Sequence, residues 1–117
     1  MRLVVFVAAI LLSVPAIACE TVRASWYGKE SCVNPKNCRT ANGDRYTGND
    51  LTAAHRTLPF GTKLRVTYKG KSVVVKINDR GPSHKIKPRR DLDLSRAAAA
   101  QIGMIGAGVA KVCISRL

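Results

Sequence analysis

The chain has 117 residues, 46% of them hydrophobic, and its 20 Lys and Arg residues against 7 Asp and Glu residues give a formal net charge of +13. This length suits one small domain with a modest core and argues against a second domain. A surface this basic attracts polyanions, but no RNA- or DNA-binding motif is present, so nucleic acid is not expected as the working partner.

Residues 1–18 have the features of a secretory signal peptide. A positive charge at Arg2 precedes an apolar run over 3–12, and Ala16-Ile17-Ala18 forms an A-x-A cleavage site before Cys19. The apolar run is shorter than the roughly 20 residues that a spanning helix needs, so we expect no transmembrane span. The predicted organisation is a signal peptide at 1–18 and one domain at 19–117, in the periplasm or outside the cell.

Short runs of β-branched and alternating residues predict a chain made mainly of strands. The turn residues Lys69-Gly70 predict a tight hairpin between two of these runs. Ser95 is a good N-cap for a helix over 96–102, which Gly103 should end. The expected strands, in chain order, are 21–26, 51–54, 63–68, 71–78, 92–94 and 109–114.

The segment Ile77-Asn78-Asp79-Arg80-Gly81-Pro82 places a lone carboxylate where a strand stops. A strand end holds an acidic side chain on a rigid backbone and leaves it accessible to a ligand, which suits catalysis. An Asp before a Gly-Pro turn also commonly hydrogen-bonds its own backbone. This motif alone does not decide between the two roles.

Six motifs in a fixed order indicate a family. They are Trp26-Tyr27-Gly28, then 39–46 (RTANGDRY), 51–55 (LTAAH), 58–62 (LPFGT), 78–82 (NDRGP) and 91–95 (DLDLS). Together they closely resemble the double-psi β-barrel domain of the rare lipoprotein A family, and more distantly expansin- and barwin-like barrels. The resemblance implies a mainly β fold, a six-stranded double-psi β-barrel with one or two short helices. In active members it implies lytic cleavage of peptidoglycan glycan strands.

The resemblance identifies Asp79, Asp44 and His55 as the catalytic candidates. In a lytic transglycosylase the muramic acid 6-hydroxyl is the attacking group, so one carboxyl can serve as acid and then as base and leave a 1,6-anhydro-muramic end. Asp79 is that residue by resemblance. Asp44 stands where active relatives generally have Glu, and it is either a neighbouring charge for Asp79 or a turn residue. His55 is expected to orient Asp79 or to bind sugar hydroxyls.

Four further residues are expected to bind substrate. Trp26 and Tyr27 could form a floor on which sugars stack, with core packing as the alternative for Trp26. Asn78 could donate a hydrogen bond to substrate or to Asp79. Arg80 is expected to point away from the catalytic pocket, because adjacent strand residues face opposite ways. Asp93, in a Leu-rich segment, is interpreted as a structural partner for loop backbone.

Four cysteines in an exported domain allow three disulfide connectivities. Cys32 and Cys38 lie in one short loop while Cys19 and Cys113 bracket the domain, so we favour Cys32–Cys38 and Cys19–Cys113. The alternative, which the family's name suggests, is a lipid on Cys19 and anchoring to the outer membrane. No metal site and no cofactor are expected, since the chain has two histidines and no paired C-x-x-C spacing.

The leading function is therefore a secreted, monomeric lytic transglycosylase-like protein whose partner is the peptidoglycan glycan strand. The alternative is a non-catalytic barrel that binds wall polysaccharide as expansins do, or a small secreted protease inhibitor. A local cluster of positively charged residues is expected to attract anionic wall polymer. It consists of Lys85, Lys87, Arg89 and Arg90.

Overall fold

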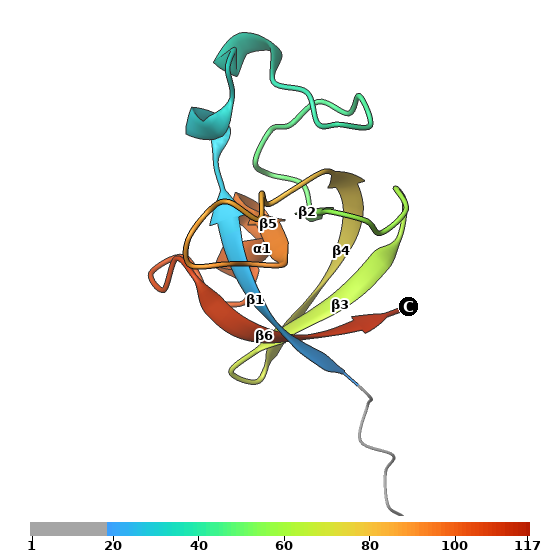
Figure 1. Ribbon diagram of the computed structural model, residues 1–117, viewed down its shortest axis with the longest axis vertical. Helices are drawn as coiled ribbons and strands as arrows, with labels where there is room; N and C mark the ends of the chain where they lie inside the picture. The colour runs from blue at the N-terminus through green and yellow to red at the C-terminus, as the bar shows by residue number, and fades with distance from the viewer. Residues whose placement is uncertain (1–18) are drawn as a thin grey trace, which may run out of the picture.

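The computed structural model describes residues 19–117. The predicted signal peptide at 1–18 lies outside the described residues. Six strands form a closed barrel in the order β1-β5-β2-β4-β3-β6 (Figure 1). The strands are β1 (Glu20–Tyr27), β2 (Thr52–His55), β3 (Lys63–Tyr68), β4 (Lys71–Asp79), β5 (Leu92–Ser95) and β6 (Ala110–Arg116), and the one α-helix is α1 (Arg96–Gln101). The expected six-stranded double-psi β-barrel is confirmed.

Strand alternation fills the barrel with aliphatic side chains. On β4, Val73, Val75 and Ile77 are at most 2% exposed, while the residues between them face outward. This is the period of two that a half-buried strand requires. The same alternation on β1 and β5 adds Ala24, Leu92 and Leu94, so the core lies on the axis of the barrel.

The two local structures expected from turn and cap residues are both present. Lys69 and Gly70 have φ angles of 46° and 80°, as a two-residue hairpin turn between β3 and β4 needs. The Ser95 hydroxyl accepts a hydrogen bond from the Ala98 N–H at 3.2 Å and so caps α1. The helix ends one residue earlier than expected, at Gln101, and Gly103 follows with a φ of 72°.

The barrel contains two parallel pairs, β1 with β5 and β2 with β4, and the other four neighbouring pairs are antiparallel. Strands β1 and β4 end at the same end of the barrel (Figure 1). The long segment between β1 and β2 rises above that end and carries two short 3₁₀ turns, Lys29–Ser31 and Pro35–Asn37. The sequence had indicated only a loop here.

Both expected disulfides are present. Cys19 pairs with Cys113 and joins the start of β1 to β6, across a sequence separation of 94 residues. Cys32 pairs with Cys38 and closes the tip of the segment above the barrel. A sulfur in a disulfide cannot also carry a thioether-linked lipid, so this pairing argues against the lipid alternative for Cys19.

Candidate active site

A bulge at the end of β4 presents Asp79 at the barrel rim. Ala53 of β2 is paired with Ile77, but the next residue, Ala54, is paired with Asp79, so Asn78 is the extra residue. Bulges of this kind bend a strand and re-aim its side chains, and they are common beside active sites. The bulge turns Asn78 inward, where it is 3% exposed, and leaves Asp79 half-buried at the rim.

Three donors hold the Asp79 carboxylate. Its Oδ1 accepts the backbone N–H groups of Ala41 and Arg80, both at 2.9 Å. Its Oδ2 accepts the hydroxyl of Tyr27 at 3.1 Å. Because these donors come from three separate segments, the carboxylate has a fixed orientation relative to both the barrel and the segment above it.

Two stacked tyrosines form one wall beside Asp79. The rings of Tyr27 and Tyr46 lie 4.6 Å apart at 19°. The Tyr46 hydroxyl donates to the carbonyl of Tyr27, which locks the pair together. Burial, and then the negative charge of Asp79, raise the pKa of the Tyr27 hydroxyl, so it remains a hydrogen-bond donor at physiological pH. Tyr46 was not among the expected site residues, although it lies in one of the six motifs.

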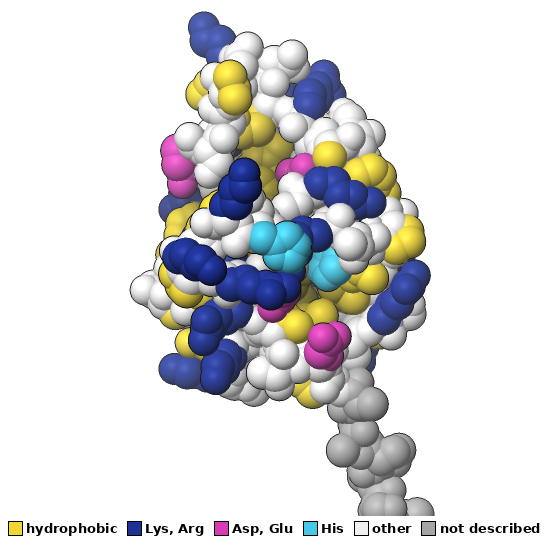
Figure 2. Space-filling view, viewed as in Figure 1, with side chains coloured by type: hydrophobic (Ala, Val, Ile, Leu, Met, Phe, Trp, Pro, Cys, Tyr) yellow, Lys and Arg dark blue, Asp and Glu magenta, His cyan; other side chains and the backbone are white. Residues whose placement is uncertain are grey.

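A cleft of about 420 Å³ separates Asp79 from the disulfide-closed loop. Figure 2 shows the hollow between this loop and the barrel, with hydrophobic side chains on its floor and an acidic group at its edge. Residues of the loop and of the barrel rim line it together: Tyr27, Ser31, Cys32, Val33, Asn34, Asn37, Cys38, Arg39, Tyr46 and Asp79. The Cys32–Cys38 disulfide therefore shapes the wall that faces the carboxylate.

Asp44 is connected to the Asp79 region through Asn78 rather than by a direct contact. Its Oδ2 accepts the side-chain amides of Asn42 at 3.0 Å and of Asn78 at 3.4 Å. These two hydrogen bonds, that of Asn42 first, lower the pKa of the exposed Asp44 carboxyl. Asp44 is thus ionised at neutral pH and holds the amide of Asn78. The Asn78 amide donates to Asp44 in this structure, and not to Asp79. A hydrogen bond from Asn78 to substrate remains a prediction.

Asp93 lies across one strand from Asp79, a relationship that the sequence did not indicate. Ala54 of β2 is paired on one side with Asp93 and on the other with Asp79, so both carboxyls belong to the same rim. Ser25 donates its hydroxyl to Asp93 Oδ1 at 3.0 Å. Burial is the main cause, and the charge of Asp79 a smaller one, that raise the pKa of Asp93 from 3.8 to about 6. Its partner is a side chain and not loop backbone, which corrects our expectation for Asp93.

His55 ends β2 but is not hydrogen-bonded to Asp79. Its Nδ1 accepts the backbone N–H groups of Thr57 at 3.1 Å and Leu58 at 3.0 Å. Burial, and then the charge of Arg56, lower the pKa of His55, so the ring is neutral with its proton on Nε2. His55 therefore organises the turn after β2, and its Nε2–H is left as the donor for any ligand.

Arg80 points away from the Asp79 carboxylate, as expected. Its guanidinium donates to the carbonyls of His55 at 3.2 Å and Leu58 at 2.8 Å. It also lies 3.9 Å from the ring centroid of Phe60. Arg80 thus fastens the turn after β2 to the end of β4, and the expected contact with substrate remains a prediction.

Trp26 faces the core. Its indole N–H donates to the carbonyl of Ile105 at 3.2 Å, and its ring packs against the core cluster. Of the two aromatic residues expected to stack on sugars, only Tyr27 lines the cleft. The packing of Trp26 against the core cluster favours the alternative given for it, core packing, over sugar stacking.

Within residues 19–117 no group of three or more His, Cys, Asp or Glu side chains is arranged to hold a metal ion. No helix in that same range is long and apolar enough to cross a membrane.

The lytic transglycolase family matches residues 19–114 of this chain. The chain is 52% identical over 93 residues to the "Probable endolytic peptidoglycan transglycosylase RlpA" of Synechocystis sp., covering 78% of this chain and 27% of that protein. It is 43% identical over 100 residues to the "Endolytic peptidoglycan transglycosylase RlpA" of Neisseria meningitidis, covering 84% of this chain and 39% of that protein. The chain therefore spans only about a quarter to two fifths of the length of these relatives.

Solved structures share the fold at low sequence identity. The Streptomyces papain inhibitor superimposes with a TM-score of 0.64 at 21% identity, covering 88% of this chain and 97% of that one. An expansin from Clavibacter michiganensis superimposes with a TM-score of 0.64 at 19% identity, covering 86% of this chain and 50% of that one. At these identities the similarity supports the barrel architecture alone.

Proposed function

Because the chain belongs to the lytic transglycolase family of double-psi β-barrels, we propose that it cleaves the glycan strands of peptidoglycan and leaves 1,6-anhydro-muramic ends. The observation that carries this proposal is the Asp79 carboxylate, held by three donors at the edge of a cleft about 420 Å³ in volume. A carboxyl so fixed is positioned to exchange a proton with a bound polymer.

In the proposed reaction Asp79 acts first as an acid and then as a base. Protonated Asp79 gives its proton to the glycosidic oxygen, and the bond from that oxygen to the muramic C1 breaks. The muramic 6-hydroxyl then attacks C1, and Asp79 takes the hydroxyl proton as the new C1–O6 bond forms. The carboxyl ends in its starting protonation state and no water is consumed. One acid is sufficient, in contrast to the carboxylate pair of a hydrolase.

The neighbouring residues would support this proton transfer. Tyr27 stays protonated and donates to Asp79 Oδ2, and both residues line the cleft. Asp93 lies on the same rim, since both it and Asp79 are paired with Ala54 of β2.

The decisive experiment is mass spectrometry of purified sacculi after incubation with the protein. Anhydro-muropeptides are expected among the soluble products. Products with free reducing ends, each heavier by one water, would indicate a hydrolase and contradict the proposal. Sacculi that bind the protein but release nothing would favour the alternative, a non-catalytic barrel that binds wall polysaccharide or a protease inhibitor.

We propose a periplasmic or secreted location for the protein, with the peptidoglycan strand as its partner. The names of these relatives refer to peptidoglycan, and two disulfides suit an oxidising compartment. Removal of 1–18 and monomeric behaviour remain predictions, which intact-mass measurement and analytical ultracentrifugation of the exported protein would test.

Asp44→Glu tests whether the shorter acid suits this site. The Asp44 carboxylate accepts hydrogen bonds from Asn42 at 3.0 Å and Asn78 at 3.4 Å, and one added methylene would displace it by about 1 Å. We expect Glu at position 44 to lower the rate of anhydro-product formation, with Asp44→Asn as the matched control for charge. A rate higher than wild type would instead identify Asp44 as a shortened catalytic partner of Asp79.

Asp93→Asn tests the raised pKa of Asp93. A carboxyl whose pKa rises from 3.8 to about 6 on folding binds its proton more tightly in the folded state. Its contribution to stability is therefore complete below about pH 4 and is lost as the pH rises through 6. We expect the free energy of unfolding of the wild type, relative to that of Asp93→Asn, to fall over this interval in urea titrations. A stability difference that does not change with pH would contradict the raised pKa of Asp93. The same substitution at an exposed acid, Glu30→Gln, is the control.

A further inference from the structure

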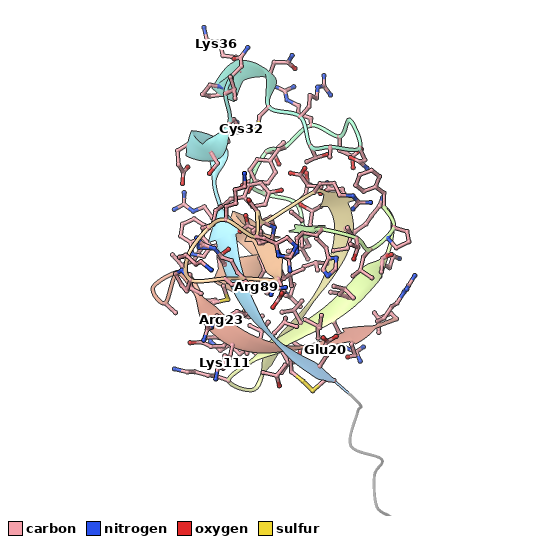
Figure 3. All side chains as sticks on the ribbon, in the orientation of Figure 1. Glu20, Arg23, Cys32, Lys36, Arg89 and Lys111 are labelled. Carbon is pink, nitrogen blue, oxygen red and sulfur yellow. A yellow bond between two sulfur atoms is a disulfide. The ribbon has the colours of Figure 1, made fainter. Side chains whose placement is uncertain are left out.

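A second groove of about 430 Å³ lies on the wall of the barrel, outside the cleft that holds Asp79. Figure 3 places Arg23, Arg89 and Lys111 on one side of the barrel, and Figure 2 shows Lys and Arg side chains gathered on this part of the surface. The groove is lined by Thr21, Val22, Arg23, Arg89, Asp91 and Lys111.

Two of these cations come from neighbouring strands in direct register. Arg23 of β1 is paired with Lys111 of β6 in an antiparallel ladder. Like charges in this relationship repel and destabilise the sheet. Both side chains are exposed, and neither makes a hydrogen bond or ion pair with any residue of 19–117. The pair therefore has no evident structural use within the described chain.

The register alone does not distinguish this pair, because Lys63 of β3 and Lys76 of β4 are also directly opposed. What distinguishes Arg23 and Lys111 is the groove and the third cation beside it. The side chain of Arg89 enters from the loop before β5 and is 60% exposed. Three cations from three segments thus face one concave surface, whereas the Lys63 and Lys76 pair lines none of the described pockets.

The one carboxylate in the groove does not neutralise these cations. Asp91 Oδ1 lies 2.7 Å from Nη2 of Arg56 and 3.9 Å from Nε of Arg89. The closer partner, Arg56, takes up the charge of Asp91. Arg23, Arg89 and Lys111 are left with an excess of positive charge in the groove.

The groove lies along the strand that leads to Asp79. Arg23, Ser25 and Tyr27 alternate on one face of β1, and Tyr27 contacts Asp79 at the far end of the series. Four residues of extended chain span about 13 Å. Ser25 between them is only 6% exposed, so this face of β1 is covered between the groove and the cleft, and the two are separate surfaces.

We propose that this groove is a binding site for the phosphate groups of an anionic envelope polymer, held by Arg23, Arg89 and Lys111. The two non-bridging oxygens of a phosphodiester sit on a tetrahedral phosphorus and accept hydrogen bonds from many directions, whereas the lone pairs of a carboxylate lie in one plane, so a phosphate suits cations that line a groove from three segments. Guanidinium groups also match phosphate geometry through paired N–H donors. The site does not depend on glycan cleavage.

The test measures binding of soluble poly(glycerol phosphate) by isothermal titration at constant ionic strength. We expect Arg23→Gln/Lys111→Gln to weaken binding by at least about tenfold, since two charge-assisted contacts are lost. The matched control, Lys63→Gln/Lys76→Gln, removes the same charge from the other opposed pair and should weaken binding much less. An equal loss in both double variants would reduce the effect to net charge and overturn the proposal.

Two further arms separate the sources of the anion. A polygalacturonate of equal charge should bind more weakly, and equal binding would overturn the preference for phosphate. Phosphatidylglycerol vesicles should also bind more weakly than the polymer, and tighter binding would identify a lipid surface instead.

The melting temperature of Arg23→Gln/Lys111→Gln should not fall, because the repulsion between the two cations is relieved. A clear fall would assign these residues a structural role and overturn the proposal.

Discussion

Asp79→Asn should lower the rate of anhydro-product formation by at least about 100-fold, the lower range of the contribution of a general acid or base. The amide keeps the shape of the carboxyl, and its oxygen can still accept the N–H groups of Ala41 and Arg80. The Tyr27 hydroxyl can rotate to accept from the new amide. The substitution removes the proton and preserves the contacts. Quantified muropeptides from matched digests would measure the loss.

Two controls make this result specific to proton transfer. The melting temperature and the binding to sacculi of Asp79→Asn should stay close to wild type. Tyr27→Phe keeps the stack on Tyr46 but removes the hydroxyl, and its loss of rate should be smaller than that of Asp79→Asn. Wild-type cleavage by Asp79→Asn would remove Asp79 from the mechanism while leaving the anion groove untouched.

Removing the Cys19–Cys113 disulfide should cost about 2–5 kcal/mol of stability, as is typical of small secreted domains. The bridge joins positions 94 residues apart and holds the first strand against the last. In the chain-entropy view, a longer closed loop restricts the unfolded state more. Equilibrium unfolding of Cys19→Ser/Cys113→Ser in urea would measure the cost.

The other bridge provides the matched comparison. Cys32→Ser/Cys38→Ser opens a loop with a separation of only 6 residues, so its stability cost should be smaller. Because that loop walls the cleft, its loss should affect cleavage more than stability. A Cys19→Ser/Cys113→Ser protein as stable as wild type would contradict the long-range role, and a lipid adduct on Cys19 in the exported protein would contradict the pairing itself.

Local sequence signals predicted the elements whose causes are local. The hairpin at Lys69-Gly70 follows from two positive φ angles in adjacent residues, and the start of α1 follows from the hydroxyl of Ser95. The barrel itself and the place of Asp79 came from the resemblance of six ordered motifs, and strand alternation alone would not have closed the sheet.

The site features that sequence did not reveal depend on registers between distant segments. The relation of Asp93 to Asp79 arises only because both are paired with Ala54. The acceptor of the Trp26 indole N–H is the carbonyl of Ile105, 79 residues away. A propensity or a spacing carries no record of such pairings, so the environment of Asp93 could not be read from its Leu-rich neighbours.

The strand order of the barrel also constrains how the chain folds. Strand β1 has β5 and β6 as its neighbours, and these are the last two strands in the sequence. Both edges of β1 therefore stay unpaired until almost the whole chain is available, while β3 and β4 can pair early as a hairpin. Such non-local closure slows folding. During export, the first strand to emerge would be among the last to gain its partners, and it would be exposed to aggregation in the interval.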